Sequence, residues 1–175
     1  GDPRMNPDPA PAQLSAEERT RLLLGISRAL GVIRDPEELI RRLARELRGI
    51  ASFDFMSLYL SDLLGSGRSW HVWRVDEQAV VPIPESVPLE ETVEAWVLAG
   101  RRAVSWPFAD GKDSLPGFEE ALARHGIGSL LAVPLEVAGR TLGAVTFGSR
   151  GVGAYPAEEA RFLGLVADQV ALAID

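Results

Sequence analysis

The chain contains no cysteine among its 175 residues and only two histidines, His71 and His125. The lack of cysteine excludes disulfides, thiolate metal sites, thiol nucleophiles and chromophores attached through a thioether. Two histidines are also too few for a histidine-rich metal site. Haem held by one of them is the alternative left open, although an isolated histidine is more often a surface or packing residue. We therefore predict no metal and no cofactor.

Two further absences limit the partners of the protein. No apolar run approaches the roughly 18 residues that a membrane span needs, and no signal peptide is visible. The net charge is −7, whereas nucleic acids and anionic membranes attract clustered cations. We expect neither direct nucleic-acid binding nor membrane association, and we expect a cytoplasmic location.

The motifs of common enzyme sites are also missing. "GIGSLL" at 126–131 has two glycines of a dinucleotide fingerprint but lacks the third, and it opens a strand instead of a helix. There is no "GxSxG" motif, and Ser129 has no histidine at a suitable spacing. Asp110 and Asp113, with Lys112 between them, indicate a solvated loop more than an acid/base pair. We predict that the chain is not an enzyme.

Helical patterns stand at both ends of the chain. Residues 1–14 are rich in proline and are expected to be a disordered tail or a cloning remnant, followed by one domain over 15–175. A capping box at Ser15 and an N-cap at Asp35 predict two opening helices. A helix over 156–175 ends without Gly, Pro or a basic last turn, so we expect the natural chain to continue, as in a module cut from a longer regulator.

Strand patterns fill the middle of the chain. Residues 53–62 alternate, and 68–75 return as the second strand of a hairpin. The run 128–149 is a second hairpin around a Gly turn, and 101–106 is a short strand. The Pro-rich 80–88 is read as a connection. Consecutive strands joined by tight turns indicate an α+β fold with a central antiparallel sheet of five to six strands.

Three segments carry a family resemblance. They are "EAWVLAGRRAVSW" (94–106), "LARHGIGSLLAVPLEVAGRTLGAVTFGSR" (122–150) and "YPAEEARFLGLVADQVALAID" (155–175). Together they resemble the GAF domain family, and the likeness spans roughly 17–175. The resemblance implies a GAF/PAS-like sheet with the N- and C-terminal helices on one face. It also implies that small helices and loops roof a ligand pocket on the other face.

The resemblance alone does not name a ligand, because GAF domains bind cyclic nucleotides, bilins, haem, non-haem iron, small carboxylates or nothing known. The lack of cysteine excludes bilin attachment, cysteine-held iron and the thiol-dependent methionine sulfoxide reductase branch. Cyclic-nucleotide members carry an Asn-Lys-Phe-Asp-Glu set. The segment "WPFADGKD" at 106–113 does not match that set.

Candidate ligand-binding residues come from three groups. Aromatic rings gather in the second strand and the roof, and on one strand Trp70 and Trp73 must face opposite sides, so only one of them can line a pocket. Arginines there, Arg102 above all, offer a cation for an acidic metabolite, with solvent exposure as the alternative. Polar residues within strands can orient a ligand. The predicted set is Trp70, Trp73, Trp96, Trp106, Phe108, Arg102, Ser57, Tyr59 and Ser129.

Two functions follow from these observations. The first is a sensory module that binds a small metabolite and passes the signal through its terminal helices to an output domain. A bacterial transcriptional regulator or a histidine kinase would be the host. The alternative is a dimerisation module with a vestigial pocket, whose seam is formed by Leu23, Leu24, Leu163 and Leu172. A homodimer through the terminal helices is expected in either case.

Overall fold

The computed structural model describes residues 15–31, 35–48, 50–61, 69–76, 79–84, 87–109 and 111–174, so the prediction for 1–14 lies outside it. The helices are α1 (Ala16–Leu30), α2 (Pro36–Leu47), α3 (Val93–Gly100), α4 (Pro116–Arg124) and α5 (Ala157–Ile174), with a 3-10 turn η1 (Leu89–Glu91). The strands are β1 (Phe55–Leu60), β2 (Ser69–Val75), β3 (Val80–Ile83), β4 (Val104–Trp106), β5 (Ser129–Val137) and β6 (Arg140–Ser149).

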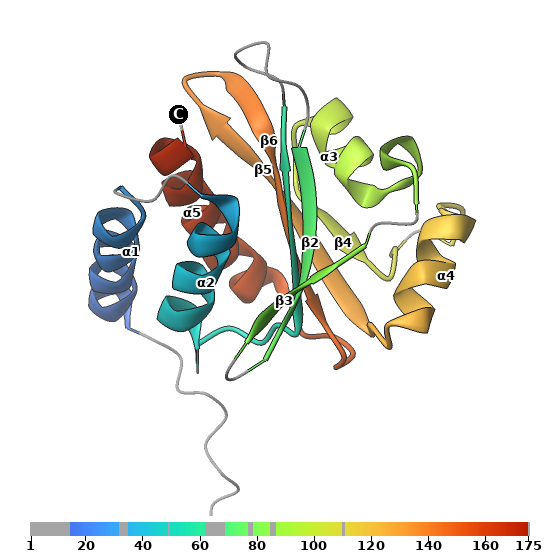
Figure 1. Ribbon diagram of the computed structural model, residues 1–175, viewed down its shortest axis with the longest axis horizontal. Helices are drawn as coiled ribbons and strands as arrows, with labels where there is room; N and C mark the ends of the chain where they lie inside the picture. Colours follow the sequence, from blue (N-terminus) through green and yellow to red (C-terminus); the bar gives the residue numbers. More distant parts are fainter. Residues whose placement is uncertain are drawn as a thin grey trace, which may run out of the picture.

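These strands form a single six-stranded antiparallel sheet in the order β3-β2-β1-β6-β5-β4. Helices α1, α2 and α5 lie on one side of the sheet, and α3 and α4 lie on the other (Figure 1). The α+β class, the number of strands and the placement of the terminal helices are therefore as the sequence predicts.

The opening helices begin at the predicted caps. The Glu18 amide donates to Ser15 Oγ and the Ser15 amide donates to Glu18 Oε2, both at 3.1 Å, which completes the capping box. Asp35 accepts a hydrogen bond from the Glu37 amide at 3.3 Å. These contacts satisfy amide groups that the helix itself leaves unpaired, so the two starts are fixed locally by sequence.

The alternation of β1 divides the interior into two cores. Met56 and Leu58 face α1, α2 and α5, where they join a large apolar cluster with Phe147 of β6. The intervening residues of β1 face α3 and α4. There a smaller cluster holds Val93, Val97, Phe118, Leu122, Leu130, Ala132 and Ala144. The central strands thus have one face against the terminal helices and the other against the small helices.

One predicted connection is a strand. Residues 80–83 form β3, which pairs along β2 with Pro82 opposite Trp73. Proline lacks the N–H that a central strand would need, and β3 tolerates it because it is an edge strand bonded to β2 alone in the described sheet.

The predicted dimer seam is partly buried within the chain. Leu163 is fully buried in the core, so it cannot contact a second copy, and Leu23 of α1 is partly buried against the core. Leu165 of α5 is 44% exposed. Helix α5 packs against both the sheet and α1, which buries a wider surface of the helix than one contact would.

Candidate functional site

A cavity of about 90 Å³ lies between the sheet and the small helices. The face of the sheet that is turned away from the terminal helices forms its floor, with contributions from β1, β2, β5 and β6. Its walls come from α3, α4 and the chain around β3. Most of its lining is apolar: Phe55, Trp70, Val72, Ile83, Phe118, Leu122 and Leu130.

The register of the sheet brings polar groups together on this floor. Ser57 of β1 stands opposite Val72 of β2 on one side and opposite Thr146 of β6 on the other. Directly opposed residues share a face of the sheet, so the two hydroxyls project side by side toward α3. Ser57 and Thr146 both line the cavity and are both buried.

Glu94 of α3 closes this polar group from above. Its Oε1 accepts hydrogen bonds from Ser57 Oγ and from Thr146 Oγ1, each at 3.0 Å. The residue is only 2% exposed and lines the cavity. Its other oxygen, Oε2, is buried and has no hydrogen-bond partner in the described part of the chain.

Such an arrangement lowers the free energy of unfolding of the protein. A buried polar group left without a partner costs about 1–3 kcal/mol, and a charged group costs more. Buried carboxylates are accordingly found paired or fully hydrogen-bonded in most proteins. The hydrogen bonding of Glu94 is half complete, which leaves one oxygen without a donor in a residue that lines an apolar cavity.

The local sequence explains how α3 buries an acidic residue. Thr92 precedes the helix, and its hydroxyl donates to the Leu89 carbonyl at 2.6 Å, which fixes the start of α3. Val93 and Val97 are both fully buried against the sheet. Glu94 lies between them in sequence and on the same side of the helix. Sequence reasoning missed it, although an acidic residue beside two inward-facing valines was a usable signal.

A second unpartnered polar atom belongs to Trp70. Its indole nitrogen is buried without a hydrogen-bond partner in the described residues, and the side chain lines the cavity. Trp73, three residues further along β2, is buried in the core under the terminal helices. It stacks there on His71, with ring centroids 5.5 Å apart. The predicted division of these two rings between opposite faces is confirmed.

Other predicted residues lie in the roof or elsewhere on the sheet, away from the cavity lining. Trp96 and Phe108 pack on each other with ring centroids 4.9 Å apart. Tyr59 is buried on the same floor, opposite Trp70 in the register. Arg102 is exposed. The structure thus brings Ser57 and Trp70, of the nine predicted residues, together at the cavity.

Ser129 and Trp106 make structural hydrogen bonds. Ser129 Oγ donates to the Gly151 carbonyl at 2.6 Å and accepts from the Ala154 amide at 3.3 Å, so it organises the loop before α5. Trp106 Nε1 donates to Glu119 Oε1 at 2.9 Å, which ties β4 to α4. That bond, followed by one from the Leu115 amide, lowers the pKa of Glu119 from its ordinary value of 4.5.

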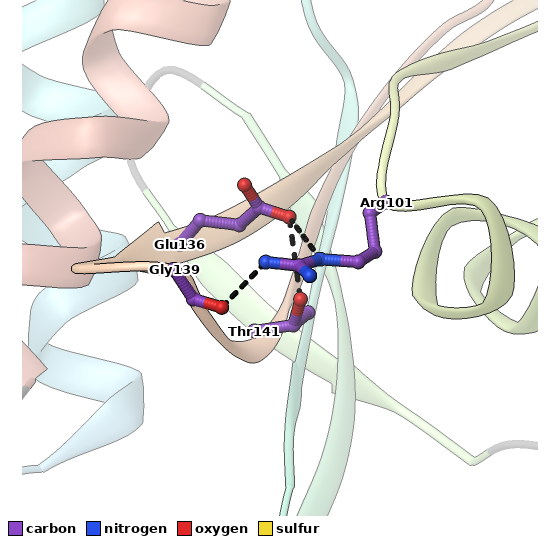
Figure 2. Close-up of polar contacts among 4 residues, drawn as sticks. All are labelled: Arg101, Glu136, Gly139 and Thr141. Atoms are coloured by element: carbon purple, nitrogen blue, oxygen red, sulfur yellow. Dashed lines mark hydrogen bonds and ion pairs between the residues drawn. The ribbon is translucent and has the colours of Figure 1, made fainter.

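The end of α3 is anchored by an arginine. Gly100 is the last helical residue, and Arg101 takes the left-handed position after it with φ 54°. Its guanidinium donates to Glu136 Oε1 at 3.3 Å and to the Gly139 carbonyl. Glu136 Oε1 also accepts from Thr141 Oγ1, so one arginine holds α3 against the turn between β5 and β6 (Figure 2).

The described residues contain no group of three or more His, Asp or Glu side chains placed to hold a metal ion. His125 lines the cavity from the end of α4 and is exposed, with its ring 6.0 Å from that of Phe55. None of the helices in the described ranges is both long and apolar enough to cross a membrane.

Comparison with known proteins adds a family and a fold. The family model described as "GAF domain" matches residues 33–175. Solved structures similar to this chain include the GAF domain of a two-component sensor histidine kinase from Bacillus halodurans, at 18% identity and TM-score 0.58, covering 81% of this chain and 95% of that one. Another is the GAF domain of an Acinetobacter phosphoenolpyruvate-protein phosphotransferase, at 16% identity and TM-score 0.62, covering 92% and 94%. No curated protein matches the chain in sequence.

One similar structure corrects a prediction. Free methionine-R-sulfoxide reductase from Neisseria meningitidis, solved with its substrate, matches at 16% identity and TM-score 0.56, covering 90% of this chain and 89% of that one. This fold therefore includes enzymes that act on a small molecule. The prediction that the chain is not an enzyme was drawn from missing motifs, and the fold does not support that exclusion.

Proposed function

This chain belongs to the GAF domain family, and we propose that its cavity between the sheet and α4 binds a small molecule as the input of a regulatory module. The observation that carries the proposal is that two residues lining an apolar cavity, Glu94 and Trp70, each hold a buried polar atom without a hydrogen-bond partner among the described residues. Pockets that recognise small molecules combine apolar lining with a few such polar groups. Similarity to the GAF domain of a sensor histidine kinase supports the regulatory role.

The route of the signal is proposed from the alternation of β6. Thr146 and Gly148 line the cavity, whereas Phe147 between them is fully buried against the terminal helices. A shift of β6 on ligand binding would directly change the packing of the core that holds α5. A ligand changes the output only if it favours one arrangement of the helices over another. The proposed output is a downstream domain of a transcriptional regulator or histidine kinase in the cytoplasm of a bacterium.

Thermal unfolding in the presence of small molecules, with a variant whose cavity is filled by a side chain, tests this function. A panel of amines, carboxylates, amino acids, purines and cyclic nucleotides is added, and the melting temperature is recorded. A ligand at 100 times its dissociation constant adds about 2.7 kcal/mol, or roughly 5–10 °C for a domain of this size. Ala121→Phe, on the cavity wall of α4, is expected to abolish the shift.

The matched control is Ala123→Phe, which places the same ring on the exposed side of the same helix. It is expected to respond to the ligand as the wild type does. Equal responses of the two variants would show that the ligand binds elsewhere, and a flat response of the wild type to the whole panel would contradict the sensory proposal.

We also propose that the terminal helices pair with a second copy of the chain. The supporting observation is that Leu24 of α1 and Leu165 and Leu172 of α5 are 54%, 44% and 58% exposed. The two leucines on α5 are seven residues apart and so share a face of that helix.

Sedimentation of the wild type and of Leu172→Lys tests the dimer. The wild type is expected to sediment as a dimer, and the variant as a monomer with an unchanged melting temperature at low concentration. Val152→Lys, at an apolar residue that is 85% exposed in the loop before α5, is the control and should remain dimeric. A monomeric wild type at high concentration would refute the pairing.

A further inference from the structure

We infer that the ligand of this cavity is a small nitrogen compound of the amine, amidine or azole class, which donates an N–H group to Glu94 Oε2. The inference rests on the proposed function, since it names the chemistry that the same cavity recognises. It departs from the acidic metabolite that the arginines in the sequence suggest.

The hydrogen-bonding capacity of Glu94 determines whether the ligand must donate or accept a hydrogen bond there. In its ionised form Glu94 only accepts hydrogen bonds, and both protein donors, Ser57 Oγ and Thr146 Oγ1, go to Oε1. Oε2 therefore needs a donor, and the described residues supply none. A ligand carboxylate or phosphate placed there would meet a second set of acceptors and would be repelled.

Apart from His125, the described lining residues of the cavity hold no side chain that can carry a positive charge. Arg102 is exposed, and Arg101 is engaged with Glu136 and Gly139 at the far end of α3. The described lining of the cavity contains neither arginine nor lysine. In such a setting an N–H donor, above all a charged one, gains a short and strong bond to the carboxylate.

The body of the ligand is limited by the rest of the lining. The cavity has a volume of about 90 Å³. An engineered cavity of roughly 150 Å³ is known to hold benzene. This smaller cavity is open to solvent on one side, so it encloses only part of a ligand of six heavy atoms. Trp70, diagonal to Ser57 in the register, contributes a flat apolar ring and a second unpartnered polar atom at the same cavity. The expected ligand is therefore a compact apolar group with a nitrogen-bearing head.

Three molecules of nearly equal shape test whether the cavity prefers an N–H donor to an anion. Isobutyramidine, isobutyramide and isobutyrate carry the same branched body and a planar head with successively fewer N–H groups. Their dissociation constants are obtained from the dependence of the melting temperature on ligand concentration. We expect affinity to fall in that order, with the amidine at least tenfold tighter than the carboxylate.

Glu94→Gln is the decisive variant. Glutamine keeps an oxygen for Ser57 and Thr146 but turns Oε2 into an NH₂ donor, so the tenfold preference for the amidine should be lost. Glu90→Gln removes the same charge at an exposed position of η1 and should retain the preference. If Glu94→Gln does not fold, the ranking of the three ligands on the wild type still decides the question.

The outcomes distinguish this inference from the function it rests on. If isobutyrate binds the wild type as tightly as the amidine, or if Glu94→Gln keeps the preference, the donor chemistry is wrong while the cavity remains a ligand site. If none of the three raises the melting temperature, the inference is also overturned. The wider panel with Ala121→Phe then judges the proposed function separately.

Discussion

Replacing Gly143 by alanine is expected to destabilise the domain by about 3 kcal/mol or more. Gly143 lies in β6, opposite Leu60 of β1 and Leu135 of β5. A Cβ atom there would stand 1.8 Å from the carbonyl oxygen of Tyr59, well inside contact distance. The obstacle is backbone and not a flexible side chain, so the two central strands would have to separate.

An irregularity in the pairing of β5 and β6 lies beside Gly143. Leu135 pairs with Gly143 and Glu136 with Thr141, so Leu142 is an extra residue on β6 without a partner in the β5 register. Bulges of this kind bend a strand and often require glycine beside them. Gly143 lies in the same β1–β6 ladder that places Thr146 opposite Ser57.

Denaturant unfolding of Gly143→Ala and Gly164→Ala measures the effect. A Cβ at Gly164, inside α5, meets nothing within 4 Å. That variant is expected to gain about 0.5–1 kcal/mol, because alanine loses less backbone entropy in a helix. Similar stabilities for the two variants would contradict the register described for β1 and β6.

Replacing the whole polar group by apolar residues is expected to stabilise the domain. The triple variant Ser57→Ala, Glu94→Leu and Thr146→Val removes the buried carboxylate and the two hydroxyls that donate to it. Exchanges of this kind commonly raise stability by about 1–4 kcal/mol, which corresponds to several degrees in melting temperature. The same variant should lose its response to isobutyramidine.

The single variant Glu94→Leu is the comparison. It leaves the hydroxyls of Ser57 and Thr146 without their shared acceptor, so it should be less stable than the triple variant. A triple variant less stable than the wild type would show that the polar group supports the fold. Gain of stability with loss of binding would identify it as a site maintained for a ligand.

Local signals in the sequence were sufficient for most of the fold. The capping box at Ser15, the alternation in 53–62 and the Gly turn in 128–149 depend on contacts within a few residues, and each appears where it was expected. β3 was missed because its pairing with β2 compensates for a proline that local patterns treat as a breaker.

The site was predicted less well than the fold for a related reason. Trp70 and Ser57 were identified because strand alternation and residue type are visible in the sequence. Glu94 can be identified as a site residue only from the tertiary structure, where β1, β6 and α3 come together. Its hydrogen-bond partners are 37 and 52 residues away in the sequence. Arg102 was predicted to offer a cation to a ligand, whereas it is exposed and is not among the described lining residues of the cavity.

The most direct test of the central claim, that a small molecule binds in the cavity beside Glu94, is the indole N–H spectrum of the nitrogen-15-labelled chain during titration with isobutyramidine. Trp70 lines the cavity, and Trp73 on the same strand faces the opposite core. We predict that the signal of Trp70 moves in a saturable way while that of Trp73 stays in place. Movement of Trp73 alone, or of neither signal, would contradict the account.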